Sequence, residues 1–248
     1  MTHAIPIRRP VLFGRRYAAE AVSLFARMAT QPDATRLALI DATIRSLIAG
    51  GVWAKLDSLY VMAAHDSQAA RLNWVANESL TAYNSPAFTV DRGFKGDGAS
   101  AYLTGPLTSA KQSQNDAMIL VGVQLWGGSG GVDFLSDWTR QVANPTRSRI
   151  NDSTYYDWTP QNTGRFYTNR SGASSRQMYR NGGLVASDAV VSLGSGGSPL
   201  LFGVLATYAG ASPCLDRIHV IARGGSMTAT EIAAFDAALS NYATTVGA

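Results

Sequence analysis

The most informative stretch of this sequence is Gln177–Val185, which reads QMYRNGGLV. Two short runs of strand-forming residues flank the dipeptide Asn181-Gly182. Asn-Gly supplies the two positive-φ residues that a type I′ turn needs between antiparallel strands. The stretch therefore predicts a β-hairpin, and it places antiparallel sheet in the C-terminal half of the chain.

Short β-rich runs continue on both sides of this hairpin. From about Asn77 onward they alternate with Gly, Asn, Ser and Pro, and turn signals recur about every eight to twelve residues, as is typical of a sandwich or barrel. The final run is expected to close the sheet. The runs are Ala87–Val90, Met118–Val123, Arg165–Tyr167, Leu200–Val204 and Ile218–Ile221.

The N-terminal part has a helical pattern instead. Apolar residues recur at spacings of three and four within 16–29, and again between Asp33 and Gly50. The run Gln31-Pro32-Asp33 separates the two, and Gly50-Gly51 ends the second, so the sequence predicts a hairpin of two helices. A first strand at 59–62 and a short helix at 67–74 are expected to follow.

The C-terminus is predicted to be a helix over 228–246. Thr228 and Glu231 have the spacing of a capping box, in which each side chain bonds a free backbone N–H near the other. An apolar stripe follows at spacings of three and four and is expected to pack on the sandwich. Its members are Ile232, Phe235, Leu239, Tyr242 and Val246.

Composition narrows the class of protein. The chain has 248 residues, of which 46% are hydrophobic and 15% charged, and this balance excludes intrinsic disorder. The single cysteine, Cys214, cannot form an intrachain disulfide and is expected to be a buried apolar residue. No apolar run approaches the roughly 20 residues of a membrane span. The first residues show no secretion signal, so we expect synthesis in a cytoplasm.

Positive charge is concentrated at the N-terminus. The formal net charge is +4, and residues 1–16 contain four arginines (Arg8, Arg9, Arg15, Arg16) and no acidic residue. These arginines alternate with apolar residues, unlike a lysine-rich nucleic-acid tail, and arginine favours bidentate pairing at protein interfaces. An arm that docks on another protein chain is favoured over a solvated tail or a nucleic-acid contact.

Several of these segments resemble concanavalin A-like, LamG-type jelly rolls. The resemblance rests on the hairpin MYRNGGLV, the strand LLFGV, the run LDRI before the last strand, and the helix start TATEIAAF. Residues 53–74 and 91–103 are similar to a version of this fold found in tailed-bacteriophage virion proteins. The resemblance covers about residues 53–248, and this fold hosts lectins, glycan hydrolases, adhesion modules and virion proteins.

An enzyme is not expected. The glucanases that the fold resembles use two glutamates on one strand, whereas the three glutamates here (Glu20, Glu78, Glu231) lie in different elements. Asp133 and Asp137 would lie about 13 Å apart on one strand face, and Asp152 and Asp157 would face opposite sides. No nucleophile elbow, nucleotide-binding loop or Cys/His zinc spacing is present. Asp91, Asp97 and Asp133 could offer oxygens to calcium, but we expect no metal and no cofactor.

An aromatic stretch interleaved with polar residues is the candidate binding site. Rings that stack on sugar C–H groups, beside amides and carboxylates that bond hydroxyls, form glycan sites, and the same residue types anchor protein interfaces. Core packing is the alternative for these rings, since neighbouring strand residues point to opposite faces. The candidates are Tyr155, Tyr156, Asp157, Trp158, Tyr167, Asn169 and Arg170.

The sequence thus predicts a mainly β protein: an antiparallel jelly-roll sandwich with an N-terminal helical hairpin and a C-terminal capping helix. Its segments are a docking arm at 1–16, a helical region at 17–52 and the jelly roll at 53–248. The favoured function is a non-enzymatic phage virion protein (tail fibre, spike or capsid decoration) that contributes to host attachment. It would dock to other virion proteins through the arm and form a homo-oligomer, with a trimer favoured, and host glycan is a further partner. The alternative is a lectin-like carbohydrate-binding module, or a remnant glycan hydrolase, of the cell envelope.

Overall fold

The computed structural model describes residues 17–106, 111–127, 132–136, 139–143, 146–158, 163–194, 201–207 and 209–248. Side chains are described throughout these ranges except at 132–136, 139–143, 146, 201 and 202. The arm at 1–16 lies outside the described residues, and so do the four arginines predicted to dock it. None of the described helices is both long enough and apolar enough to cross a bilayer.

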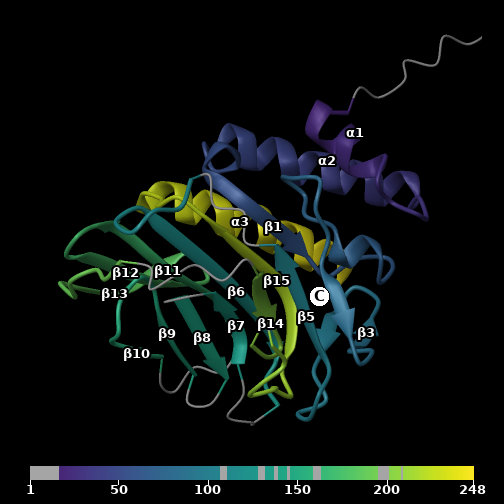
Figure 1. Cartoon of the computed structure of the whole chain (residues 1–248). Helices are drawn as coiled ribbons and strands as arrows, with labels where there is room; N and C mark the ends of the chain where they lie inside the picture. Colours follow the sequence, from purple (N-terminus) through teal and green to yellow (C-terminus); the bar gives the residue numbers. More distant parts are fainter. Residues whose placement is uncertain are drawn as a thin grey trace, which may run out of the picture.

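Two antiparallel sheets face each other (Figure 1). The eight-stranded sheet has the order β13-β12-β11-β6-β15-β4-β3, with β1 also paired to β15, and the seven-stranded sheet has the order β10-β9-β8-β7-β14-β5-β2. The first sheet contains β1 (Leu56–Val61), β3 (Ala87–Thr89), β4 (Gly93–Lys95), β6 (Ala117–Leu125), β11 (Gly164–Gly172), β12 (Ser175–Arg180), β13 (Gly183–Asp188) and β15 (Arg217–Gly224). The second contains β2 (Thr81–Tyr83), β5 (Tyr102–Pro106), β7 (Val132–Ser136), β8 (Thr139–Ala143), β9 (Thr146–Arg149), β10 (Tyr156–Asp157) and β14 (Leu201–Val204).

The predicted hairpin is β12 and β13. Asn181 and Gly182 both have positive φ, at 48° and 78°, as the Asn-Gly turn requires. The last strand, β15, was expected to close the sheet, but it lies in the interior, between β6 on one side and β1 and β4 on the other. The difference arises because the sheet is completed by β1, β3 and β4, which precede β15 by more than 100 residues in the chain.

The helices largely follow the sequence pattern. α2 (Ala34–Ala49) is capped by the Asp33 carboxylate, which accepts the N–H of Arg36. α3 (Ala229–Val246) begins with the predicted capping box of Thr228 and Glu231. α1 covers only Ala19–Phe25, shorter than the expected 16–29, because the chain tightens there into i→i+3 hydrogen bonds.

The described residues also contain two short 3₁₀ turns, Trp53–Lys55 and Ala69–Arg71. The second takes the place of the helix predicted for 67–74. It ends because Leu72 begins an extended segment that bridges to Ser79. The guanidinium of Arg27 then ties the turn after α1 to this segment by donating to the carbonyls of Asn73 and Ala76, at 2.7 and 2.8 Å.

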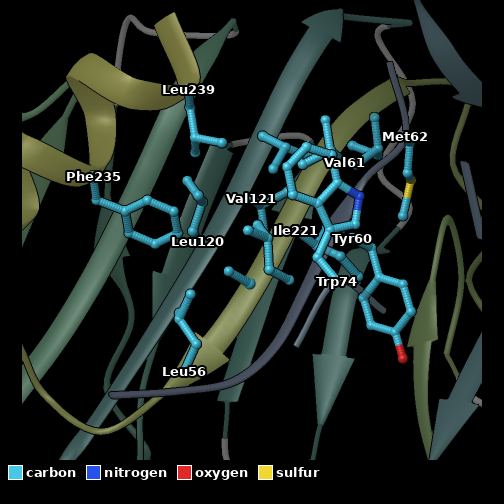
Figure 2. Close-up of a cluster of buried hydrophobic side chains, with 14 of the residues drawn as sticks. Leu56, Tyr60, Val61, Met62, Trp74, Leu120, Val121, Ile221, Phe235 and Leu239 are labelled. Carbon is cyan, nitrogen blue, oxygen red and sulfur yellow. The ribbon is translucent and has the colours of Figure 1, made fainter. Parts of the chain in front are cut away.

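The hydrophobic core has two layers, one on each side of the eight-stranded sheet. Phe166 points between the sheets, while its neighbour Tyr167 points outward and packs edge-to-face on Phe235 of α3, with ring centroids 5.8 Å apart. Figure 2 shows Phe235 and Leu239 of α3 directed onto the sheet near Leu120. The outer face of the eight-stranded sheet is therefore covered by α3, against which α2 packs.

Candidate ligand-binding face

The seven candidate residues predicted from the sequence do not form one surface, because strand alternation and the two sheets separate them. Trp158 is buried between the sheets, where its indole N–H donates to Ser148 Oγ at 2.8 Å. Its ring packs edge-to-face on Phe166, and the half-buried Tyr156 packs on Trp158 in turn. The Trp158 ring has no exposed face on which a sugar could stack.

Two more candidates lie on the other side of the molecule, beneath α3. The Tyr167 hydroxyl donates to Asp236 Oδ1 at 3.0 Å, and burial with this carboxylate raises the pKa of Tyr167 well above its usual value. Asn169 exchanges two hydrogen bonds with the backbone of Met227, at 2.8 and 3.0 Å. Both side chains therefore hold the start and middle of α3 on the sheet.

Arg170 belongs to a buried ion network. It donates to Asp152 at 2.7 Å, and Arg176 donates to both Asp152 oxygens at 3.1 Å and to Asp188 at 2.6 Å. The side chains of Arg170, Arg176 and Asp152 are no more than 1% exposed. Carbonyl oxygens accept further hydrogen bonds from both guanidinium groups, including those of Ile150 and Thr154. This network is satisfied internally and has no free donor for a ligand.

Tyr155 and Asp157 remain, and they lie at one edge of the outer face of the seven-stranded sheet. Ser148 of β9 points inward, so its neighbours Arg147 and Arg149 point outward. The guanidinium carbons of Arg147 and Arg149 lie 4.4 and 4.9 Å from the centroid of the Tyr155 ring. Asp157 is exposed and pairs in register with Arg147. Figure 1 places the described helices on the opposite side of the sandwich.

A second aromatic feature lies at the opposite edge of the same face. Leu103 of β5 is in the core, so Tyr102 points outward, and its register partner on β2 is Tyr83. The two rings are stacked, with centroids 4.8 Å apart and planes 6° apart. Tyr83 is 43% exposed, so the free side of its ring is an aromatic platform open to solvent.

Polar groups surround this platform. Asn84 follows Tyr83 in a left-handed conformation and donates from Nδ2 to the carbonyl of Ser100 at 2.9 Å. Asp97 caps the same loop: the N–H groups of residues 101, 99 and 100 all bond its Oδ1 and lower its pKa to about 2. A carboxylate with a lowered pKa and an amide thus lie in the loops that adjoin the two stacked tyrosines.

Sequence reasoning missed this platform. Tyr83 and Tyr102 are 19 residues apart, and each is one aromatic residue in an otherwise ordinary turn-rich segment. Only the pairing of β2 with β5 brings them together. The available signal was the run Tyr83-Asn84-Ser85, because Asn and Ser favour turns and so place the tyrosine at the end of a strand.

The carboxylates considered for catalysis or metal binding have other partners. Glu231 caps α3 and accepts from Lys55 at 2.6 Å, and Glu78 accepts from Asn73. Asp91 is paired with Arg36 at 2.8 Å. Within the described part of the chain, no three His, Cys, Asp or Glu side chains are grouped as metal ligands would be. Asp137, and the side chain of Asp133, lie outside the described residues.

Comparison with known proteins identifies the architecture. No family model matches the sequence, and no curated protein matches it. Among solved structures, the botulinum neurotoxin serotype D binding domain superposes with a TM-score of 0.56 at 9% identity, covering 73% of this chain and 51% of that one. The fold is a concanavalin A-like sandwich.

A second group of similar structures supports the same architecture. Trypanosoma rangeli sialidase superposes with a TM-score of 0.53 at 11% identity, over 82% of this chain and 39% of the sialidase. The receptor-binding domain of a mosaic C/D botulinum neurotoxin gives 0.54 at 10% identity. The chain spans about half the length of the neurotoxin domains and less of the sialidase. At these identities the concanavalin A-like likeness establishes the fold alone.

Proposed function

We propose that this protein is a non-enzymatic, lectin-like module that binds carbohydrate on the outer face of its seven-stranded sheet. The observation that carries the proposal is the stacked pair of Tyr83 and Tyr102, whose exposed ring is presented by the paired strands β2 and β5. An aromatic platform flanked by a few polar groups is the usual composition of a sugar-binding site. Asn84 follows Tyr83 directly, and Asp97 caps the loop that leads to Tyr102, so polar residues lie in both adjoining loops.

The similar proteins support a binding role of this kind. Two of the superposed structures are described as a neurotoxin binding domain and a receptor-binding domain. The concanavalin A-like fold itself does not determine an activity, so the proposal rests on the exposed platform rather than on the fold.

The phage setting predicted from the sequence remains a prediction, and it is compatible with glycan recognition at a host surface. Light scattering on the full chain measures its mass in solution and so tests the predicted homo-oligomer. If the N-terminal arm joins the copies, changing Arg8, Arg9, Arg15 and Arg16 to Gln should lower the measured mass. A mass equal to that of one chain in both proteins would contradict the predicted oligomer.

A glycan array tests the carbohydrate proposal. The wild-type protein should bind a defined subset of bacterial and host glycans, and Tyr83→Ala should lose that binding while it folds normally. Leu184→Ala is the matched control, because Leu184 is 58% exposed on β13, in the other sheet. An array without hits, or a Tyr83→Ala protein that binds as well as the wild type, would contradict the proposal.

A further inference from the structure

We propose that Arg147, Tyr155 and Arg149 form a subsite for the anionic group of an acidic glycan. This inference rests on the proposed carbohydrate-binding function and names its substrate class: an oligosaccharide that carries carboxylate or sulfate groups.

Strand β9 brings the side chains of Arg147 and Arg149 to the same aromatic ring. Arg147 and Arg149 are two residues apart on β9 and point to the same, outer face, so their Cα atoms lie about 7 Å apart. Both guanidinium groups lie against the one ring of Tyr155. Cation–π contact of this kind holds long, flexible side chains in place, which lowers the entropy lost when they bind a ligand.

Hydrogen-bonding partners differ among the buried and half-buried arginines. Four buried or half-buried arginines of this protein, Arg36, Arg165, Arg170 and Arg176, are paired with carboxylates. Arg147 differs: within the described residues it has no ion pair, and its buried Nε has no hydrogen-bond acceptor. Asp157 lies opposite Arg147 in register, yet the two do not form an ion pair. Arg147 is therefore a planar cation without a carboxylate partner among the described residues.

The cluster of Arg147, Tyr155 and Arg149 is suited to an anionic ligand group. Guanidinium donors match the two oxygens of a carboxylate or sulfate, and bidentate pairs of this type are the stronger hydrogen bonds. The ring of Tyr155 is occupied by the two arginines, so this cluster is suited to an anion rather than to a stacked neutral sugar. We expect a neutral sugar ring to bind at the Tyr83 platform instead.

The two features share one face and fit one extended ligand. From β9 to β5 there are four strand spacings in the sheet order β9-β8-β7-β14-β5, which separates the features by about 20 Å. A free inorganic anion could occupy only the arginine end. An acidic oligosaccharide can reach both ends, and this is why we assign the cluster to a glycan.

The test compares matched charged and neutral glycans on the full-length protein by isothermal titration calorimetry. The probes are oligogalacturonates of two to six units with their methyl esters, and dextran sulfate oligomers with unsulfated dextran. Sodium sulfate alone tests the free anion. The variants are Arg147→Gln and Tyr83→Ala. Arg45→Gln on α2 is the control that removes the same charge away from this face, and its folding is checked because Arg45 also pairs with the buried Asp41.

We expect the acidic member of a pair to bind at least about tenfold more tightly than the neutral one, and Arg147→Gln to remove most of that difference. Arg45→Gln should not change the difference, and added salt should weaken only the acidic ligands. Longer oligomers should bind more tightly than dimers, and sulfate alone should compete weakly.

Three results would overturn the inference. The first is equal binding of acidic and neutral glycans, with binding unchanged in Arg147→Gln and lost in Tyr83→Ala. This result would contradict the anion subsite and leave the proposed function standing. Full competition by millimolar sulfate would make the cluster a simple ion site. Absence of binding by any probe, together with an array without hits, would overturn the proposed function itself.

Discussion

Asp152 accepts from two arginines that are as deeply buried as it is: its oxygens lie 2.7 Å from Arg170 Nη2 and 3.1 Å from Arg176 Nη1. A carboxylate placed between two buried guanidinium groups neutralises charges that would otherwise be costly to remove from water. The network joins β11 and β12 to the loop that precedes β10.

Asp152→Asn should strongly destabilise the fold. The variant leaves two buried arginines with one remaining carboxylate, and breaking a buried pair in this way costs about 3–5 kcal/mol. The shift in the midpoint of urea unfolding measures this loss of stability. Asp157→Asn is the matched control, since Asp157 is exposed and its midpoint should be unchanged. Equal midpoints for the two variants would show that the network contributes little.

Trp158 should act on stability rather than on binding. Trp158→Ala removes a buried ring that contacts Phe166 and leaves the Ser148 hydroxyl without its indole donor. The loss in unfolding free energy should be about 3–5 kcal/mol. Binding per folded molecule should stay at the wild-type level, measured by titration below the unfolding midpoint. A stable Trp158→Ala protein that no longer binds glycan would mean that the ring is exposed to ligand.

His219 should make the protein less stable in mild acid. It is the extra residue of a bulge between β15 and β6, and neither ring nitrogen has a hydrogen-bond partner among the described residues. Burial, with a further contribution from Arg165, lowers its pKa to about 4, although Asp236 acts in the opposite direction. Between about pH 6.5 and 4 the unfolded state binds a proton that the folded state excludes.

Stability should therefore fall with decreasing pH in this window, by at most about 1.4 kcal/mol per pH unit from this group. The stability that the protein gains from a neutral His219 is fully present above pH 6.5. Chemical denaturation between pH 7 and 5, where few carboxyl groups titrate, isolates it. His219→Leu should flatten the profile in that range. An unchanged slope in the variant would mean that the imidazole is solvated in the folded protein.

The capping box should contribute a modest, local stabilisation. Thr228 Oγ1 accepts the N–H of Glu231 at 3.2 Å, and the Glu231 carboxylate accepts the N–H of Thr228 at 2.7 Å. Thr228→Ala should cost about 1 kcal/mol, and Thr228→Ser should restore most of it. Hydrogen exchange at the first turn of α3 should increase in the alanine variant alone. Equal exchange in both variants would contradict a capping role.

Much of the fold could be predicted because its signals are local. Asn181-Gly182, Asp33 and Thr228 each set a turn or a helix start within four residues, and all three occur as expected. The interior position of β15 could not be predicted, since pairing partners far apart in the chain leave no local signal.

The candidate site was predicted only in part, for the same reason. A dense aromatic stretch does not reveal which sheet each residue joins, and a shift of one residue reverses every side chain. Trp158 and Tyr155 are three apart, yet one is core and the other faces outward. Tyr83 and Tyr102 became a candidate only when β2 and β5 were paired.

The most direct test of glycan binding on the outer face of the seven-stranded sheet is fluorine NMR. The protein is labelled with 3-fluorotyrosine and titrated with the glycan that binds most tightly on the array. The chain has ten tyrosines, and single Tyr→Phe variants assign the signals. If glycan binds on this face, the signals of Tyr83 and Tyr155 should shift on binding, while those of the buried Tyr60, Tyr167 and Tyr242 should not. Shifts confined to tyrosines away from the outer face of the seven-stranded sheet would contradict glycan binding on this face.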